Sequence, residues 1–587
     1  GVYYCNLGAG TILAVNPFQD VSNLFDEKKI TSYHSSLLSE LSCMPAHVFA
    51  VAERALRNMK EGNNQSVIIS GESGAGKTWT VRCLMRYLAT VNLQHAALNL
   101  SDSFVGDEIE HRVLSSNPIL EAFGNAATPR NHNSSRFGKY IQLQYDRCGT
   151  MVGANLHVYL LEKTRVSNRD QFERSYHIFY QMLNGCSEEE RKEWKLPDAE
   201  RMDDESAFEK TRQSMMSVGI FTEAQNQIFT TLSAILHLNQ LEFEGDDDLS
   251  NPCTVRSEFQ ANTKTSAQLL AVPINHLVQT LTFRKIEAGS TRSADRRRSI
   301  FKRPCTRAEC RARRDAMVKC VYERLFLWLV KQIGNDLSAP DKSAFHFIGL
   351  LDVYGFESFK HNCLEQLCIN YANEKLQQYY IHNFLKLKQV GYKTLDELAL
   401  EGVSWDGMEI NDKISCLNAL ESTRNSLFAL LNEECRLNRT TDALQLKSRL
   451  TDSFHKSPYI TQPRISTETP SFTVNHYAGK VVYAVKLLTV KNKDELPLEI
   501  RELLVDSTNP FICNLFLDKS PDPATPSTKG KSLETVLSQF KKSLDELLTT
   551  MSTTNCNYIR CIKPNMESLP SKFDSRHVSL YRYYFIS

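Results

Sequence analysis

The alternation of apolar and polar residues predicts strands and helices mixed along the whole chain. Strand-like apolar runs lie at 10–18, 66–70, 141–144, 347–353, 472–483 and 558–562. Helical spacing fills much of the remainder, and it is clearest where Val81, Leu84, Met85 and Leu88 follow an i, i+3, i+4, i+7 pattern. Such a mixture predicts an α/β fold built on an open sheet.

The longest helical pattern begins at Asn362 and reaches Gln389 without proline or glycine. At about 1.5 Å of rise per residue this helix would be roughly 40 Å long. We expect an unbroken rod that can carry a signal away from the loop before it. A second apolar stretch, 322–333, is charged at both ends, which predicts a buried helix and not a membrane span.

The run at 66–70 leads into GESGAGKT, residues 71–78, a complete G-x-x-x-x-G-K-[ST] motif followed by a helix. Its glycines let backbone N–H groups turn toward anionic oxygens, and the helix adds its positive N-terminal end. Lys77 can reach the β and γ phosphates, and Thr78 can bind Mg²⁺. Because strand, loop and helix stand in the required order, the motif predicts a P-loop NTPase with its ligand at the carboxyl ends of the strands.

The composition is that of a large globular protein with several core-forming units. The chain has 587 residues, of which 42% are hydrophobic and 23% charged, and its formal net charge is +1. The overall charge therefore attracts neither nucleic acid nor membrane. Sixteen cysteines without paired spacing predict reduced thiols. Cys305, Cys310 and Cys320 lack a CxxC or a matching histidine pair, so we expect no zinc site there.

Two further loops carry residues suited to closing on the phosphates. The first, residues 131–139 (NHNSSRFGK), offers amides, hydroxyls and the planar cation of Arg136. The second, residues 351–357 (LDVYGFE), follows an apolar strand. There Asp352 is the natural partner for Mg²⁺ through water, and Gly355 lets a backbone N–H approach the γ phosphate.

Arg136 and Glu357 could pair across this site and lock both loops over the phosphate. Such a gate would exclude bulk water and orient the attacking water. Hydrolysis of a phosphoanhydride depends more on an oriented water and stabilised charge than on a strong base. The alternative is an ordinary exposed ion pair worth about 0 to 1 kcal/mol. We favour the gate, because each residue lies inside a glycine-containing loop.

Together these motifs resemble the motor head of the myosins. GESGAGKT is similar to the family's phosphate loop, NHNSSRFGK to its first switch, LDVYGFE to its second and LEQLCINYANEKLQQ to the start of its relay helix. Further matches between Asn16 and Asn565 are NPILEAFGNA, LLEKTRV, ERSYHIFYQ, LLNEEC, HYAGKV, KNKD and YIRCIKPN. Kinesins share the three-loop logic, but their first switch has a Ser-His pair in place of Phe137 and Gly138. GTPases need an NKxD motif, and residues 492–494 lack its spacer.

The segments GESGAGKTWT, LLDVYGFESF and KRPCTRAEC are similar to the class nineteen unconventional myosins, whose members associate with mitochondria. The resemblance implies ATP and Mg²⁺ as cofactors and filamentous actin as the partner. It implies a cytoplasmic head on the actin cytoskeleton, with the mitochondrial outer surface reached through a tail absent from this sequence. Calmodulin-like light chains would bind only a longer form, and we expect neither nucleic acid nor membrane contact from this segment.

The resemblance also assigns roles to individual residues. The catalytic set that it implies is Lys77, Ser134, Arg136, Gly355 and Glu357. Thr78 and Ser135 would bind Mg²⁺ directly, and Asp352 through water. The nucleotide-binding set that it implies is Asn16, Pro17, Phe18, Phe25, Gly71, Glu72, Ser73, Gly74, Ala75, Gly76, Lys77, Thr78, Asn131 and Asn133. Phe25 stands near the position of the family's usual tyrosine, so we expect it to stack on adenine without a hydroxyl contact.

The family pattern implies a central, mostly parallel twisted sheet surrounded by helical actin-binding subdomains. Residues 1–130 would form the nucleotide-binding subdomain, and 131–351 the upper actin-binding subdomain with the first switch. The second switch, relay helix and lower actin-binding subdomain would occupy 352–470. Central-sheet strands and a surface loop would follow at 471–565, and a truncated C-terminal helix at 566–587.

Two segments depart from the family pattern. After the relay helix the chain reads KQVGYKTLDELALEGVSW, with an apparent insertion before Glu401 and Gly402. After Leu580 it reads YRYYFIS where the family continues toward a converter. We therefore expect a head that lacks its converter and has no complete stroke of its own.

The stretch between Arg284 and Arg314 is the most basic part of the chain. It holds twelve Lys or Arg against three acids, a local excess of +9. The matching myosin region is an actin-facing loop, and actin's acidic surface would be attracted to this charge. A solvated face without a partner is the alternative. Ser299 follows three arginines, and its phosphorylation could tune the affinity for actin.

A second actin contact is implied for residues 422–442, with Leu427 and Phe428 as candidate apolar contacts. Core packing is the rival explanation for both side chains. The leading functional hypothesis is an actin-activated Mg-ATPase. Its competitors are a non-cycling head that binds nucleotide or actin, and an unrelated nucleotide switch.

Overall fold

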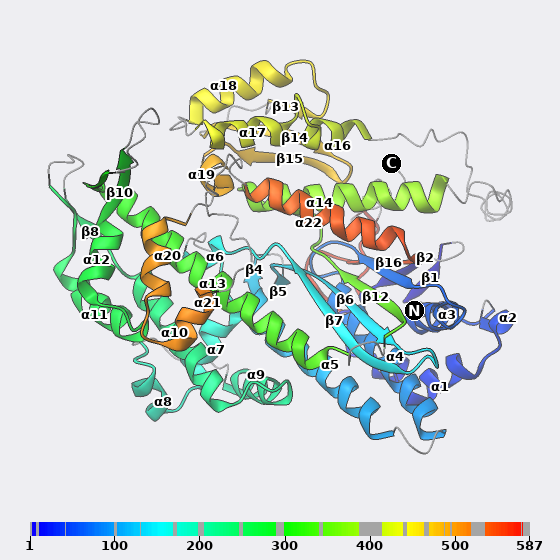
Figure 1. Cartoon of the computed structure of the whole chain (residues 1–587). Helices are drawn as coiled ribbons and strands as arrows, with labels where there is room; N and C mark the ends of the chain where they lie inside the picture. Colours follow the sequence, from blue (N-terminus) through cyan, green and yellow to red (C-terminus); the bar gives the residue numbers. More distant parts are fainter. Residues whose placement is uncertain are drawn as a thin grey trace, which may run out of the picture.

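A mixed sheet of seven strands runs through the middle of the computed structural model (Figure 1). The structure describes residues 3–7, 11–41, 43–98, 103–129, 131–167, 173–197, 205–245, 251–288, 299–339, 344–386, 414–437, 443–462, 469–486, 488–493, 496–517, 535–576 and 578. The strands, in spatial order, are β1 (Tyr4–Asn6), β2 (Thr11–Val15), β16 (Asn555–Ile562), β3 (Gln65–Ser70), β12 (His346–Asp352), β6 (Gly138–Tyr145) and β7 (Met151–Tyr159).

The centre of the sheet is parallel and its edges are antiparallel. β16 pairs in parallel with β2 and β3, and β12 pairs in parallel with β3. β1, β6 and β7 join through antiparallel pairings. The predicted strand runs are confirmed except at 472–483, which forms two paired strands of a separate sheet and not strands of the central one. The parallel centre brings the carboxyl ends of β3 and β12 to one edge. The α/β fold of a P-loop NTPase is thereby confirmed.

Alternate residues of the central strands supply two different cores, as the two-residue period of a strand requires. Ile68, Tyr140, Leu351 and Tyr558 belong to a core shared with α14 (Leu364–Tyr380), α16 (Ile414–Glu421), α17 (Leu427–Arg436) and α22 (Val536–Ser552). The opposite face belongs to the larger core, with α3 (Val48–Lys60), α4 (Lys77–Leu98), α5 (Ser103–Gly124) and α13 (Arg307–Leu337). The sheet therefore separates two helical layers.

Helices of the larger core extend into one end of the molecule. They are α6 (Thr164–Ser167), α7 (His177–Gly185), α8 (Glu188–Glu193), α9 (Glu205–Ser217), α10 (Thr222–Asn239), α11 (Gln260–Leu269), α12 (Ile274–Thr282), α20 (Leu498–Val505) and α21 (Pro510–Leu517). α1 (Glu27–Ser35) and α2 (Leu38–Leu41) lie near α3 (Figure 1). Two short hairpins join them, β8 (Phe243–Glu244) with β9 (Thr254–Val255), and β10 (Phe283–Ala288) with β11 (Ser299–Pro304).

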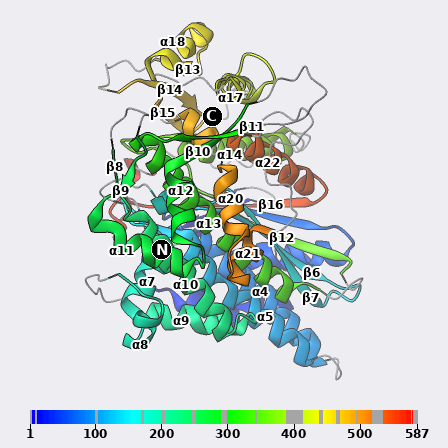
Figure 2. The ribbon, with the colours of Figure 1, turned by 60° about the vertical axis from the view of Figure 1, so that its left-hand side comes forward.

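The opposite end holds a three-stranded sheet of β13 (Ile460–Thr461), β14 (Ser471–His476) and β15 (Gly479–Ala484). α17, α18 (Ala443–Phe454) and α19 (Leu488–Lys493) lie beside it. Both views place this group at the top of the molecule, far from α8 and α9 at the bottom (Figure 2). The two ends are linked through the sheet and through α14.

The relay helix is shorter and less regular than the sequence predicted. α14 begins at Leu364 and not at Asn362, because the Asn362 side chain accepts from the N–H of Phe359 at 2.8 Å and closes a turn. The α-helix ends at Tyr380 and continues as a π-helical turn, η3 (Ile381–Lys386). The helix is therefore continuous from Leu364 to Lys386 but changes its winding after Tyr380, and residues 387–389 lie outside the described part.

The helix predicted at 322–333 is confirmed within α13, where Leu325, Phe326, Leu329 and Ile333 are buried. Within the described ranges, no helix combines the length and apolarity needed to cross a membrane. None of the sixteen cysteines, all of which fall in described segments, forms a disulfide. The prediction of reduced thiols is thereby confirmed.

Candidate functional site

The phosphate loop lies between β3 and α4, at the carboxyl end of β3. Its turn is tight, because Gly71, Gly74 and Gly76 have positive φ angles of 148°, 81° and 93°. Gly71 also passes very close to β16, since a Cβ at this position would lie 2.3 Å from the carbonyl O of Cys561. Only glycine fits where the two segments cross.

Lys77 and Thr78 begin α4 beside the carboxyl end of β12. The Nζ of Lys77 donates to the carbonyl O atoms of Gly71 at 3.0 Å and Glu72 at 2.8 Å. Burial lowers the pKa of Lys77, although the Asp352 carboxylate opposes this shift. The Thr78 hydroxyl donates to Asp352 Oδ2 at 3.0 Å, which brings together two of the groups that the sequence assigned to Mg²⁺.

The third predicted metal ligand, Ser135, lines the same cavity as Thr78 and Asp352. Its hydroxyl donates to the carbonyl O of Phe137 at 2.7 Å. Two hydroxyls and one carboxylate are the kind of oxygen ligands that Mg²⁺ takes in phosphate sites. The residues present therefore fit this ion.

The first switch is more regular than the loop that the sequence predicted at 131–139. It forms β5 (Asn131–Ser135), which pairs with β4 (Asn125–Thr128), and then enters β6. The Asn131 side chain donates to the Ser73 hydroxyl at 3.4 Å, and the Ser134 hydroxyl lies 3.4 Å from the same oxygen. The first switch and the phosphate loop are therefore in direct contact.

Arg136 and Glu357 form the ion pair that the sequence predicted. Two N–H groups of the guanidinium donate to the two carboxylate oxygens at 2.7 Å and 3.2 Å. Arg136 is 0% exposed and Glu357 is 3% exposed, so the alternative of an exposed ion pair is wrong. The pair joins the first and second switches in a protein interior where water screens the charges poorly.

A second carboxylate, Glu162, also holds Arg136. The guanidinium Nε donates to Glu162 Oε2, and Arg165 donates to the same oxygen at 3.0 Å. Burial opposes ionisation of Glu162, but the two arginines outweigh it and hold the pKa of Glu162 at about 2. Sequence reasoning missed Glu162, although it stands in the LLEKTRV motif.

The second switch touches both the phosphate loop and α14. A Cβ on Gly355 would lie 2.6 Å from the carbonyl O of Gly71, so the switch backbone packs directly on the loop. Two residues later, the N–H of Glu357 donates to Asn370 Oδ1 at 2.9 Å. Asn370 Nδ2 donates back to the carbonyl O of Glu357 at 2.7 Å. The relay helix therefore holds the second switch by its backbone.

These segments surround a cavity of about 480 Å³. The predicted residues that line it are Asn16, Phe18, Ser73, Gly74, Gly76, Lys77, Thr78, Asn131, Asn133, Ser134, Ser135, Asp352, Gly355 and Glu357. The predicted residues Pro17, Phe25, Gly71, Glu72, Ala75 and Arg136 lie outside this lining. Lining residues that sequence reasoning missed are Trp79, Pro129, His132, Val353, Tyr354, Met566, Glu567 and Ser568.

Phe25 does not face the cavity, contrary to the expectation that it stacks on adenine. It is 7% exposed, and its ring packs against His47 and Phe49 with centroids 5.5 Å and 6.0 Å away. The ring of Trp79 lies between this cluster and solvent, edge-on to Phe25 with centroids 6.0 Å apart. The signal that could have identified Trp79 is its position directly after Thr78.

The basic stretch is less available to a partner than its sequence predicted. Arg313 and Arg314 are buried, and Arg314 pairs with Asp315 at 2.7 Å. Arg313 lies 3.4 Å from Glu499, and Arg311 pairs with Glu242. The local excess of +9 is therefore partly neutralised within the fold, because the helical part of the stretch belongs to α13.

The remainder of this stretch is the β10–β11 hairpin. Lys285 pairs with Glu502 of α20, and Lys302 donates to Gln279 of α12 at 3.3 Å. Arg284 is exposed on β10. Ser299 begins β11 opposite Ala288, and residues 289–298 lie outside the described part.

Leu427 and Phe428 are core residues and not exposed apolar contacts. Leu427 is fully buried, and the ring of Phe428 lies edge-on to Tyr371 of α14 with centroids 4.8 Å apart. The expectation that they face a partner is therefore wrong, because α17 packs against α16, α19 and α22, and Phe428 also contacts α14. Residues 438–442 of this segment lie outside the described part.

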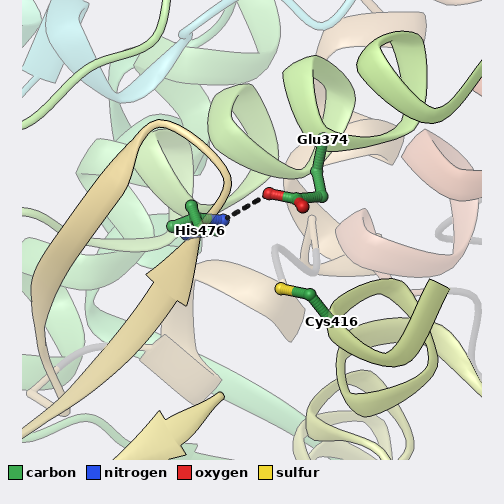
Figure 3. A group of neighbouring side chains, drawn as sticks. All are labelled: Glu374, Cys416 and His476. Carbon is green, nitrogen blue, oxygen red and sulfur yellow. Dashed lines mark ion pairs between the residues drawn. The ribbon is translucent and has the colours of Figure 1, made fainter. Parts of the chain in front are cut away.

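A buried cluster of Glu374, Cys416 and His476 lies beside α14 and was not expected from the sequence (Figure 3). His476 Nδ1 lies 3.4 Å from Glu374 Oε2, and its Nε2 lies 2.8 Å from the Tyr483 hydroxyl. The Cys416 thiol donates to the carbonyl O of Asn475 at 3.6 Å. These contacts join α14, α16 and β14.

The cluster is connected to the second switch. Asn370, which holds the backbone of Glu357, also donates to the Tyr483 hydroxyl at 2.8 Å. A buried polar path therefore runs from Glu357 through Asn370 and Tyr483 to His476. The segment with the apparent insertion before Glu401, and the surface loop near 518–532, lie outside the described residues.

Comparison with known proteins agrees with this geometry. A family model of the myosin head (motor domain) matches residues 2–582. Unconventional myosin-XIX of Xenopus laevis is 45% identical over 580 residues, and that of Homo sapiens is 43% identical over 586 residues. Each alignment covers 97% of this chain but only 58% and 59% of those relatives, so the chain spans less than two thirds of their length. Myosin-52 of Schizosaccharomyces pombe is 39% identical over 596 residues, covering 97% of this chain and 38% of that protein. The predicted resemblance to motor heads of class nineteen is confirmed, and the chain belongs to the myosin head (motor domain) family.

Proposed function

We propose that this chain is an actin-activated Mg-ATPase that converts hydrolysis of ATP into changes of an actin-binding cleft. The observation that carries the proposal is the buried, two-bonded pair of Arg136 and Glu357 between the two switches. A buried pair of this kind depends on the exact position of both switches. It is therefore suited to sense whether the γ phosphate is in place.

Each residue has a task in this proposal. The phosphate-loop N–H groups and Lys77 bind the triphosphate, and Thr78, Ser135 and Asp352 hold Mg²⁺, which neutralises charge on the phosphates when bound. The Ser134 hydroxyl and the N–H of Gly355 bind the γ phosphate. Arg136 and Glu357 exclude bulk water and orient the attacking water, which serves phosphoryl transfer better than a strong base.

Actin contact is proposed for the exposed cations of the β10–β11 hairpin and for the described exposed surface of 422–437. Binding there would be coupled to the site because Asn370 of the relay helix holds the second switch. The five predicted subdomains and the Ser299 phosphorylation site also stay predictions. So do light chains bound to a longer form and a cytoplasmic location at the mitochondrial surface, which rest on the class nineteen resemblance.

Steady-state and single-turnover ATPase of Glu357→Gln, with and without filamentous actin, tests this function. The substitution keeps the size of the side chain but removes the charge that pairs with Arg136. We expect the ATP cleavage step to slow roughly 100-fold, as for loss of one preorganised electrostatic contact, while ATP still binds. Glu323→Gln is the matched control, because Glu323 pairs with Lys163 in a partly exposed position.

Three outcomes would contradict the proposal. Unchanged cleavage by Glu357→Gln would remove the gate from the mechanism. Tight binding of ATP or actin by the wild-type chain without turnover would favour the non-cycling alternative. A preference for GTP would favour an unrelated nucleotide switch.

A further inference from the structure

Trp79 is an exposed aromatic side chain at the edge of the nucleotide cavity. It is 55% exposed, and it contributes to the lining of the cavity together with Phe18 and Asn16. Exposing an indole to water is costly, because it leaves a large apolar surface hydrated. A tryptophan in this position therefore suggests a ligand with a flat apolar face.

The position of Trp79 in α4 separates it from the phosphate end of the cavity. It directly follows Thr78, whose hydroxyl is bonded to Asp352 at 3.0 Å. Successive residues of an α-helix point in directions about 100° apart. A ligand whose phosphates lie at Thr78 would therefore have its other end available to Trp79.

The turn that follows β2 is fixed by hydrogen bonds and lines the same cavity as Trp79. The Asn16 side chain donates to the carbonyl O of Gly74 at 2.9 Å and accepts from the N–H of Phe18 at 3.0 Å. Phe18 has a φ of 50°, an unusual value for a residue with a side chain. The turn is thereby fixed to the phosphate loop, and Phe18 joins Trp79 in the lining.

The indole is supported from behind by a rigid aromatic cluster. Phe25 meets Trp79 edge-on at an interplanar angle of 85°, and Phe25 is itself packed on Phe49. Edge-on contacts of this kind stabilise aromatic pairs beyond simple burial. One face of the indole can therefore meet a ligand without any rearrangement of the core.

We propose that Trp79 is the residue that positions the purine base of the nucleotide, the role that the sequence assigned to Phe25. The proposal rests on the proposed function, since it concerns the base of the same triphosphate. Stacking on an indole needs a π face and no particular hydrogen bond, so it accepts any base, and the larger face of a purine should bind only modestly better than that of a pyrimidine. Phe25 then acts as the support for Trp79 and not as a contact of the base.

The test compares Trp79→Ala and Trp79→Phe with the wild-type chain. Binding of Mg·ATP, Mg·CTP and magnesium tripolyphosphate is measured by calorimetry. We expect Trp79→Ala to raise the Kd for Mg·ATP roughly tenfold, the size of one lost stack of base on aromatic ring. Trp79→Phe should restore most of that affinity. The affinity for tripolyphosphate, which has no base, should be the same in all three proteins.

Tryptophan fluorescence gives a second readout on the same samples. ATP should quench the wild-type signal, and Trp79→Phe should abolish the quench. Trp328→Phe is the control, because Trp328 packs edge-on against Phe511 with centroids 5.1 Å apart, away from the cavity lining. It should keep both the quench and the affinity.

The outcomes separate this proposal from the proposed function. If the wild type binds Mg·ATP but Trp79→Ala binds it equally well, the role of Trp79 is overturned and the ATPase stands. Equal losses of tripolyphosphate and ATP affinity would show a structural defect, which also overturns the role. If the wild type binds neither ATP nor tripolyphosphate, both proposals fall.

Discussion

Arg136 forms ion pairs with two carboxylates, and these pairs explain how its charge is stabilised in the protein interior. Glu162 holds the guanidinium from one side and Glu357 from the other. These acids raise the pKa of Arg136 well above its usual value, although burial alone would lower it. Separating Arg136 from Glu357 leaves the guanidinium still paired with Glu162. This costs less free energy than breaking a buried ion pair that has no second acid. Glu162 is thus suited to retain Arg136 when the two switches part.

His47 is expected to make the stability of the chain depend on mild acid. Burial, with a contribution from nearby Lys29, lowers the pKa of His47 to about 4. Between about pH 6.5 and about pH 4, His47 is protonated in the unfolded chain but neutral in the folded chain. The free energy of unfolding is therefore highest above about pH 6.5 and decreases as the pH falls toward about 4. The whole effect amounts to about 3 kcal/mol. Thermal unfolding measured between about pH 7 and about pH 5 should reveal it.

The matched variant is His47→Asn. His47 caps α3 by accepting from the N–H of Phe49 at 3.1 Å, and asparagine is also a good helix cap. The variant loses ring packing and is less stable overall, but its unfolding temperature should change less over this pH range. An equal pH dependence in both proteins would assign the acid sensitivity to other groups.

The roles of individual residues were predictable from the sequence where a motif contains both the residue and the kind of group that it contacts. The glycines of the phosphate loop follow from local spacing, and the pairing of Arg136 with Glu357 follows from opposite charges in two loops that both carry nucleotide-site residues. Phe25 was misplaced because an aromatic residue beside a nucleotide motif can equally serve as the support of another ring. Glu162 and Trp79 were missed because their roles depend on which segments the fold brings together.

At the scale of elements, β12 must carry glycine at position 349 to accept the ring of Tyr140. A Cβ at Gly349 would lie 2.1 Å from the Tyr140 hydroxyl O and 2.4 Å from its Cζ. That hydroxyl is also bonded to Ser66 at 3.0 Å, so the ring cannot simply move aside. We expect Gly349→Ala to lower the free energy of unfolding by about 1–3 kcal/mol, as overpacking does. Urea denaturation measures the loss.

Gly334→Ala is the control for this substitution. It lies inside α13 with no heavy atom within 4 Å of the added Cβ, so it should leave stability unchanged or raise it slightly. In a Tyr140→Leu background the cost of Gly349→Ala should shrink, since the two positions share one space. Additive effects of the two substitutions would argue against this explanation.

The buried polar path from Glu357 to His476 connects the second switch with α14. Through it, α14 can respond to the nucleotide. Tyr483→Phe removes the hydroxyl that links Asn370 with His476 but keeps the ring. We expect ATP binding to be unchanged and stimulation by actin to fall about fivefold, a modest loss of coupling. Actin titrations of the steady-state ATPase measure this change.

Tyr33→Phe is the comparison for Tyr483→Phe. It also removes one hydroxyl hydrogen bond of 2.8 Å, to the carbonyl O of Pro45, at a place far from α14 in the chain. Both variants should lose about 1 kcal/mol of stability, but only Tyr483→Phe should lose stimulation. The same loss in both would point to general destabilisation.

Strand positions were the most predictable elements, because apolar runs between turn residues leave few alternatives. Helix ends and switch conformations were less so. The sequence of the first switch predicts a polar loop, but β5 forms there because it pairs with β4. No local pattern in the sequence indicates this pairing. The end of α14 at Tyr380 likewise has no proline or glycine to announce it.

At the scale of the whole molecule, the basic stretch divides into exposed and internal charges, and the two classes should behave differently. Arg284 and Arg307 are exposed, whereas Arg314 is buried and paired with Asp315. We expect Arg284→Gln, in the hairpin, to weaken actin binding about two- to fivefold and to reduce its salt dependence, whereas Arg307→Gln, in α13, should change both less. Cosedimentation with filamentous actin at several salt concentrations measures both.

Arg314→Gln is the contrasting variant. It should lower the free energy of unfolding by about 1–3 kcal/mol, because the half-buried Asp315 loses its partner. Its actin affinity at low temperature should stay near the wild-type value. A loss of actin affinity equal to that of Arg284→Gln would mean that the buried cations also reach the partner.

Charge counted along the sequence overstated the basic surface because the acids that neutralise it come from distant segments. Glu242, Glu499 and Glu502 all lie outside 284–314. The fold class and the identity of the three nucleotide segments were predictable from motifs. How much charge remains available was not, since it depends on tertiary pairing.

The placement of β16 between β2 and β3 also has a consequence for synthesis on the ribosome. Its carbonyl at Cys561 abuts Gly71, and its neighbours in the sheet are strands made hundreds of residues earlier. A nascent chain that has emerged only as far as β12 lacks the strand that joins those two, and contacts of such long separation form slowly. The nascent protein would thus remain unable to hold nucleotide until nearly all of this sequence has been translated, with strand edges in need of chaperone protection meanwhile.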